Sequence, residues 1–208
     1  MAILDIVLFP EEREVLTTMC EPVEEVTDEI RTLVDDMIET MYHANGVGLA
    51  APQIGVTKRV TVIDIRRRPS DEKPPEGEVE ETKAPQEISE AEDKVFVLIN
   101  PEILEREGKL KWEEGCLSFP SLYGEVVRAN KVKVRALDRD GEPYEFEAEG
   151  LLAVALQHEI DHLDGVLFLD RMSRLKRRMA QKEYKKIRAR MLEEALEKEE
   201  EESGSDIS

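Results

Sequence analysis

The chain of 208 residues contains only two cysteines, Cys20 and Cys116, which are far too few for a disulfide framework. It has no run that approaches the ~18 apolar residues of a membrane-spanning helix. Its N-terminus, MAILDIVLFPEERE, lacks the basic segment and long apolar run of a secretory signal. We therefore expect a cytoplasmic protein of a reducing compartment, with no membrane segment and no membrane partner.

Positive charge is also scarce, because 29 Lys and Arg residues stand against 48 Asp and Glu residues, for a net charge of −19. A chain this acidic is unsuited to coating nucleic acid with its whole surface, although a local basic face is possible. The acid is concentrated in 71–93, which has ten acidic residues, two lysines, three prolines and no aromatic residue. Such a segment cannot bury enough apolar surface to offset its ordering entropy. We predict a disordered insertion there.

The remaining sequence has the length and patterning of one globular domain. A first helix is predicted from Thr27, a suitable N-cap, to a stop at Gly46, with apolar residues at helical spacing between them. Short β-like segments follow at 58–65, 94–100, 102–106, 122–127, 131–137 and 143–149. The last two flank the turn sequence DRDGE, which predicts a hairpin. The segment 150–163 predicts a largely apolar and therefore buried helix.

These elements predict an α+β fold in which antiparallel sheets surround a central helix, 150–163, with an N-terminal and a C-terminal helix beside them. The globular domain is expected to occupy 1–172. A basic C-terminal helix is expected over 173–198, and a disordered acidic tail over 199–208.

Two histidines of the apolar helix, His158 and His162, lie four residues apart, and Glu159 follows the first. Residues four apart share one face of a helix, so both imidazoles can converge on one metal ion. Glu159 is rotated by about a quarter turn and can reach a water beside that ion, as in the H-E-x-x-H motif. Five residues are a weak indication by themselves, because histidines at a helix end can equally serve as polar caps.

A catalytic metal site needs a third ligand, and Cys116, in the stretch EEGCLSFP, is the candidate. A lone cysteine is more often a small buried hydrophobe. We interpret Cys20 in that way, because nothing around it indicates a function. Cys116 differs because the residues around it match a known motif.

Three segments, GVGLAAPQIG (46–55), EGCLSFP (114–120) and QHEIDHLDG (157–165), resemble the three signature motifs of the peptide deformylase family. They occur in the order of the family and at compatible spacings, and the resemblance covers the chain to about residue 175. The stretch EGCLSFPSLYGEVVR further resembles the subtype in which a tyrosine follows the second motif. The acidic segments 71–93 and 199–208 depart from the family pattern and lie outside the motifs.

The resemblance implies a single catalytic deformylase domain over 1–172 that removes the N-formyl group from N-formylmethionyl nascent peptides. It implies one iron(II) ion per chain, which zinc, nickel or cobalt can replace, held by Cys116, His158 and His162. Glu159 would take the proton of the attacking water and pass it to the leaving amine. The side-chain amide of Gln53 and the backbone N–H of Leu117 would stabilise the developing oxyanion.

Substrate contacts are expected at Gly46, Gly48, Ile54 and Tyr123. The two glycines let a peptide approach the chain without obstruction, and Gly46 also suits the end of a helix. Tyr123 stands where many bacterial members carry an arginine, which changes the contacts available to the substrate backbone. The apolar lining expected for the methionine pocket is Ile54, Leu151 and Val154, although ordinary core packing explains each of them equally well.

Two other functions are compatible with parts of the sequence. An H-E-x-x-H metallopeptidase takes its third ligand downstream, where Glu183 is the candidate, 21 residues after His162. A structural metal site or ribosome-binding module is suggested by 171–190, which has ten Lys or Arg residues and one Glu. The family resemblance also implies that a C-terminal helix can dock beside the ribosomal exit tunnel. We favour the deformylase because three separate motifs agree, and we expect Glu114 and Arg128 to pair and to hold the metal-bearing segment.

Overall fold

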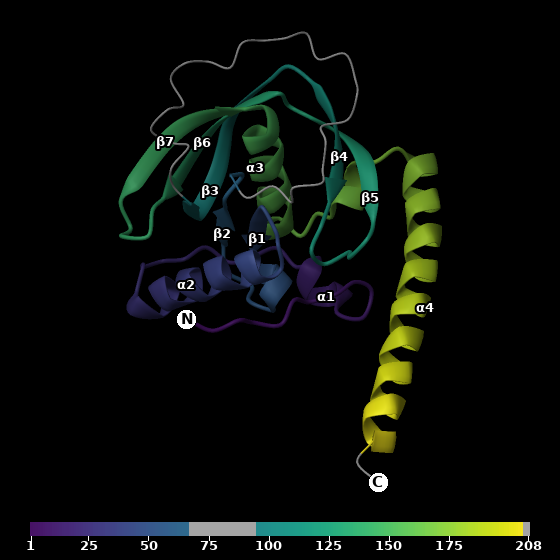
Figure 1. Cartoon of the computed structure of the whole chain (residues 1–208). Helices are drawn as coiled ribbons and strands as arrows, with labels where there is room; N and C mark the ends of the chain where they lie inside the picture. The colour runs from purple at the N-terminus through teal and green to yellow at the C-terminus, as the bar shows by residue number, and fades with distance from the viewer. Residues whose placement is uncertain (67–94, 206–208) are drawn as a thin grey trace.

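The computed structural model describes residues 1–66 and 95–205, with the backbone alone for 198–205 (Figure 1). The predicted insertion, 71–93, lies outside the described residues. The helices are α1 (Arg13–Leu16), α2 (Asp28–His43), α3 (Gly150–Leu163) and α4 (Arg174–Ser205), with short 3₁₀ turns η1 (Ala51–Ile54) and η2 (Phe168–Arg171). The strands are β1 (Gly48–Ala50), β2 (Val60–Ile63), β3 (Phe96–Glu107), β4 (Leu110–Gly115), β5 (Tyr123–Arg128), β6 (Lys131–Leu137) and β7 (Pro143–Glu149).

Five strands form an antiparallel sheet in the order β1-β2-β3-β6-β7, and β4 and β5 form a separate antiparallel pair. The hairpin predicted around DRDGE is confirmed as β6–β7, where the Asp138 carboxylate accepts the N–H groups of Asp140 and Glu142. The predicted combination of helices with antiparallel sheets is therefore confirmed.

Strand β3 unites two segments that the sequence predicted as separate, 94–100 and 102–106. Its register against β6 shifts between Ile99 and Glu102, and Asn100 has a left-handed backbone with φ of 52°. Pro101 lies within this irregularity, and proline, which has no N–H to donate, is tolerated in a sheet at such bulges. The proline therefore interrupts the ladder locally without ending the strand.

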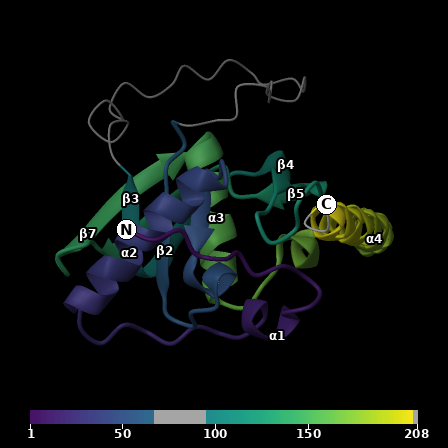
Figure 2. The ribbon, with the colours of Figure 1, turned by 60° about the horizontal axis from the view of Figure 1, so that its bottom comes forward.

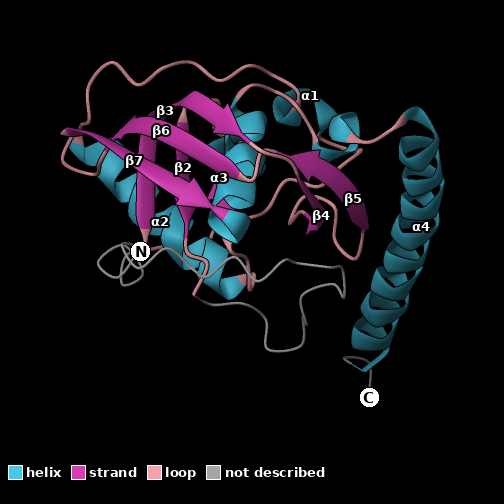
Figure 3. Ribbon diagram, turned by 90° about the horizontal axis from the view of Figure 1, so that it is seen from above, coloured by secondary structure: helices cyan, strands magenta, loops and turns pink. Residues whose placement is uncertain are grey.

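Helices α2 and α3 cover opposite faces of the larger sheet. Along β2, Val60 and Val62 pack in the cluster that contains the apolar side of α2, whereas Ile63 packs in the cluster that contains α3. Successive strand residues point to opposite faces, so one strand serves both layers. Every residue of α3 from Leu152 to Leu163 is buried, as its apolar composition predicts. Figure 3 shows the strands lying across these helices.

Helix α4 stands at one side of the body, beside β4 and β5 (Figure 2). Its early turns bury Ala180 and Tyr184 against an aromatic cluster that includes Phe9 and Phe119, and its later turns extend past the body (Figure 1). The helix was expected to end at Lys198 before a disordered tail, but it continues to Ser205. The glutamate-rich run is the physical reason, because glutamate favours helix strongly. Within 1–66 and 95–205, no helix is long and apolar enough to cross a membrane.

Candidate active site

Three side chains from distant parts of the sequence meet at one point. Helix α3 presents His158 and His162 on one face, and Cys116 directly follows β4. The Cys116 sulfur lies 3.2 Å from Nε2 of His162, and one potential ligand atom from each of the three residues lies within 4.8 Å of the others. The predicted ligands are thus brought together, although 42 residues separate Cys116 from His158.

The donor set and its surroundings fit a divalent transition metal. A thiolate and two imidazoles suit zinc and iron(II) alike. Burial lowers the pKa of His162 well below its ordinary value, which keeps this ring in the neutral form that a ligand requires. One carboxylate oxygen of Glu159 is also buried without a hydrogen-bond partner in the described part of the chain. A buried polar atom of this kind is costly unless something else satisfies it.

A chain of buried ion pairs orients the His158 ring. Its Nδ1 lies 2.8 Å from the Glu114 carboxylate, which also accepts two hydrogen bonds from Arg128, at 2.7 and 2.9 Å. Arg128 donates further to Asp161, and Asp161 accepts two hydrogen bonds from Arg171. The expected Glu114–Arg128 pair is confirmed, whereas nothing in the local sequence indicated the other two contacts.

This network sets the charge around the ligands. Burial by itself would raise the pKa of Glu114, but the hydrogen bonds from Arg128 and His158 hold it at about 2. Burial would likewise lower the pKa of His158, yet its contacts with Cys116 and Glu114 raise it well above the ordinary value. A metal ion must therefore displace a proton from this ring, because imidazole binds metals in its neutral form.

Glu159 lies beside the ligands in a space that a glycine leaves open. Burial raises the pKa of Glu159 to about 7. A Cβ atom at Gly48 would lie 2.4 Å from Oε1 of Glu159, and a Cβ at Gly46 would lie 2.8 Å from Cδ1 of Leu117. Both glycines were expected to make room for substrate. The structure shows that they make room for the carboxylate and for the segment that follows Cys116.

The side chain of Gln53 is held in a single orientation. Its oxygen accepts the N–H of Ala50 at 2.8 Å, which fixes the identity of the amide ends. Its nitrogen lies 3.4 Å from both the Cys116 sulfur and the Ser118 hydroxyl. Gln53 is buried, and its amide donor therefore points towards the metal ligands. Sequence pattern alone does not predict this orientation, because η1 is only four residues long.

A cavity of about 720 Å³ opens onto these groups. Of the residues expected to touch substrate, Gly46, Gly48, Leu151, Val154 and Tyr123 line it. Ile54 is not among the lining residues and packs instead in the core cluster of α2. The 3₁₀ geometry of η1 explains this correction, because neighbouring residues lie about 120° apart and Gln53 faces the site. Trp112 and Glu113 of β4 line the mouth as well, and they were missed because the sequence did not predict β4.

Glu183, the candidate ligand of the metallopeptidase interpretation, and Cys20, interpreted as a buried hydrophobe, both lie outside the cluster of predicted ligands. Glu183 is exposed on α4 and is not part of the Cys116, His158 and His162 cluster. Cys20 is buried in a small cluster with Ala50 and Leu163, and burial raises the pKa of its thiol to about 11. A thiol of this kind is a poor metal ligand, because the thiolate is the binding form. The metallopeptidase interpretation is therefore not favoured.

We predict that Arg128→Ala destabilises the fold by about 3–5 kcal/mol, because it removes the buried cation shared by Glu114 and Asp161, and of these two only Asp161 keeps another, Arg171. Metal affinity should fall too, since Glu114 no longer holds His158 in place. Thermal unfolding and competitive metal titration measure the two effects. Arg135→Ala, which breaks an exposed pair with Glu102, is the control and should change stability by less than about 1 kcal/mol. An Arg128→Ala protein with unchanged unfolding temperature and metal affinity would contradict the prediction.

Comparison with known proteins agrees with this geometry. The family model for polypeptide deformylase matches residues 3–178. The peptide deformylase of Alkalilimnicola ehrlichii is 48% identical over 187 residues, which are 90% of this chain and 92% of that protein. The crystal structure of a peptide deformylase from Legionella pneumophila matches with a TM-score of 0.74 and 44% identity, over 92% of this chain and 98% of that one. The peptide deformylase structure from Thermus thermophilus matches with a TM-score of 0.73 and 37% identity, over 92% and 99% of the two chains. This chain belongs to the polypeptide deformylase family.

Proposed function

We propose that this chain is a cytoplasmic, metal-dependent hydrolase that removes the N-formyl group from the N-terminal formylmethionine of newly synthesised proteins. The observation that carries the proposal is the convergence of Cys116, His158 and His162 beside Glu159. One oxygen of the Glu159 carboxylate has no hydrogen-bond partner within the described residues, and Cys116, His158 and Glu159 line an open cavity. Helix α3 acts as the central element that presents both histidines and Glu159. Hydrolysis of formyl-Met-Ala, followed together with the metal content of the same anaerobically prepared protein, tests the assignment.

Cys116, His158 and His162 are the proposed ligands of one iron(II) ion per chain, which zinc, nickel or cobalt can replace. When bound, such an ion polarises the formyl carbonyl and lowers the pKa of the attacking water. Glu114 and Arg128 hold His158 in its ligating orientation through the ion pairs described above.

The other groups of the site act on the substrate. Glu159 takes a proton from the attacking water and delivers it to the amine that leaves. The Gln53 amide and the Leu117 N–H donate to the charge that develops on the formyl oxygen, and loss of one such donor costs about 10²–10³ in rate. Leu151 and Val154 supply an apolar wall for the methionine side chain.

Tyr123 is proposed as the mark of the tyrosine subtype and as a contact for the bound peptide. It lies at the cavity mouth and is 54% exposed. A Cβ atom at Gly115 would lie 2.8 Å from its ring, so the glycine allows the ring to approach the strand that precedes Cys116.

We predict that Glu159→Gln keeps its metal and loses about 10²–10⁴ in kcat. The amide preserves the shape of the side chain but cannot accept the proton. Steady-state kinetics and elemental analysis of the same sample measure both properties. Glu147→Gln, on the exposed side of β7, is the control. Activity within a few-fold of the wild type, with full metal content, would remove Glu159 from the mechanism.

Cys116→Ser is expected to weaken metal binding, whereas Cys20→Ser should leave it unchanged, because only Cys116 lies among the proposed ligands. The cobalt-substituted proteins give a direct readout through the thiolate-to-cobalt charge-transfer band. This band should vanish in Cys116→Ser and persist in Cys20→Ser. The reverse pattern would assign the thiolate ligand to Cys20.

We also propose that the basic part of α4 binds RNA phosphate near the exit of the ribosome, where the substrate emerges. Lys176 and Arg177 already pair with Glu125 and Asp170. The lysines farther along the exposed side of α4 are therefore better placed to bind phosphate. Binding of this kind is driven by counterion release and falls steeply with salt.

The expected result is weak, salt-sensitive co-sedimentation with ribosomes that strengthens when the residues after Leu192 are deleted. It should be lost when Lys182, Lys185 and Lys186 become alanine, with hydrolysis of a free formyl dipeptide unaffected. The control replaces Lys131 and Lys133 of β6 by alanine. Equal pelleting of the wild type and the triple variant would overturn this part of the proposal.

A further inference from the structure

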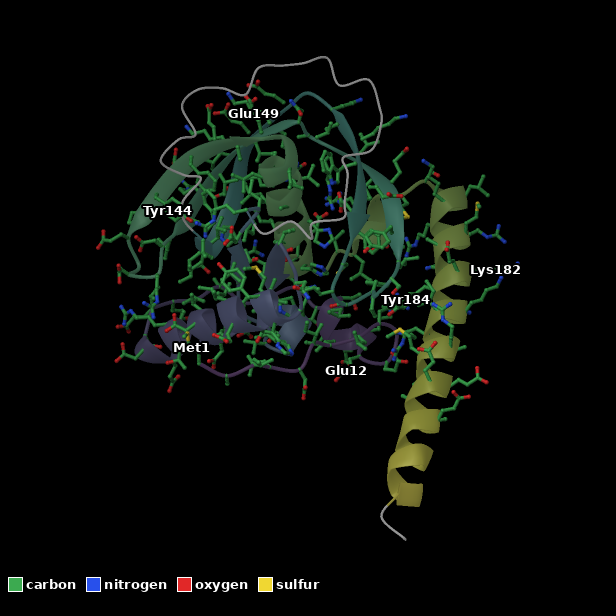
Figure 4. All side chains as sticks on the ribbon, viewed as in Figure 1. Met1, Glu12, Tyr144, Glu149, Lys182 and Tyr184 are labelled. Atoms are coloured by element: carbon green, nitrogen blue, oxygen red, sulfur yellow. The ribbon has the colours of Figure 1, made fainter. Side chains whose placement is uncertain are left out.

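Helix α4 has one face that packs against the body of the protein and another, here called the open face, that is exposed. Figure 4 shows Tyr184 directed towards the body and Lys182 directed away from it. Tyr184 is 2% exposed, whereas Leu175, Met179 and Leu196 are 70%, 63% and 61% exposed. Because each helical residue advances by 100°, these three apolar residues lie about 120–180° around the helix from Tyr184. Exposed apolar side chains along one helix face are typical of an interface.

The same helix is divided by charge along its length. The run 171–190 has ten Lys or Arg residues and one Glu, and 193–202 has seven Glu residues and one Lys. The acidic run cannot fold back on the basic one, because both belong to a single helix that continues to Ser205. The helix has 32 residues and is therefore about 48 Å long, so its two charged halves are held apart.

We propose that the open face of α4 is an interface between two copies of this chain, whose α4 helices pair side by side in antiparallel orientation. In this arrangement the basic half of each helix lies along the acidic half of the other. A two-fold axis makes both halves of the contact identical, as in most homodimers. A parallel pair would instead set like charges together.

One register satisfies the apolar and the charged residues at once. With the two-fold axis between 185 and 186, Leu175 lies level with the partner subunit's Leu196, and Met179 with the partner subunit's Leu192. Arg174 and Arg178 then lie level with the partner subunit's Glu197 and the partner subunit's Glu193. No ion pair of these four charged residues is formed within the described part of the chain.

The pairing is weak, for two reasons. Lys185 and Lys186 flank the axis, where Lys185 of each chain lies level with the partner subunit's Lys186, and this repulsion opposes association. Every charged contact is exposed, and pairs of this kind contribute little individually and are screened by salt. The interface also covers the basic half that the ribosome would use, so a second copy and RNA phosphate compete for it.

The test uses charge reversal of the full-length protein, purified free of nucleic acid and followed by analytical ultracentrifugation. The wild type should associate at chain concentrations up to about 100 µM, and less so in high salt. One variant carries Arg174→Glu and Arg178→Glu, and the other carries Glu193→Arg and Glu197→Arg. Each alone sets like charges opposite one another, so its self-association should weaken by at least about tenfold.

An equimolar mixture of the two variants should associate again, because each supplies the charge that the other lacks. The protein with all four changes should also associate, since it restores opposite charges in both halves. Circular dichroism and hydrolysis of a free formyl dipeptide should be unchanged throughout, which separates this inference from the proposed reaction.

A wild type that stays monomeric would overturn the proposal, and so would a mixture that behaves like its separate components. Monomeric protein that binds RNA oligonucleotides through Arg174 and Arg178 would overturn it in favour of nucleic acid. Association that both reversals leave unchanged would place the contact on another surface and overturn it as well.

Discussion

The guanidinium of Arg128, buried between the carboxylates of Glu114 and Asp161, is the contact on which the metal site depends. Glu114 precedes Cys116 by two residues, and Asp161 immediately precedes His162. One cation therefore holds together the two segments that carry the ligands. Because Arg128 is buried, its charge is tolerated only when both carboxylate partners are in place. The apolar packing of α3 fixes the position of the helix, and the ion pairs align the two ligand-bearing segments with each other.

Sequence patterns predicted those features that are encoded within a few residues. The periodicity of α2, the hairpin at DRDGE and the shared face of His158 and His162 are local, because a helix turn or a two-strand turn involves neighbours in the chain. The family motifs added Cys116 and Gln53, whose positions cannot be deduced from spacing.

Features that arise from contacts between distant residues were not predictable in this way. Asp161 and Arg128 are separated by 33 residues, and no local sequence pattern predicts the hydrogen bond between them. The direction of Ile54 depends on a single 3₁₀ turn, and β4 is recognisable only through its partner β5. The extent of α4 was underestimated because acidic composition was equated with disorder, although glutamate is also a good helix former.

The cavity leads to the proposed metal ligands as well as to the proposed peptide contacts. Cys116, His158 and Glu159 all line it, and His162 behind them is 1% exposed. In the proposed reaction, an ion and a formylated peptide would therefore share one entrance. Under the proposed function, a peptide in this entrance would shield the ion behind it from chelators and from oxidants in solution. A well-supplied enzyme would therefore, under the proposed function, retain its metal longer than an idle one.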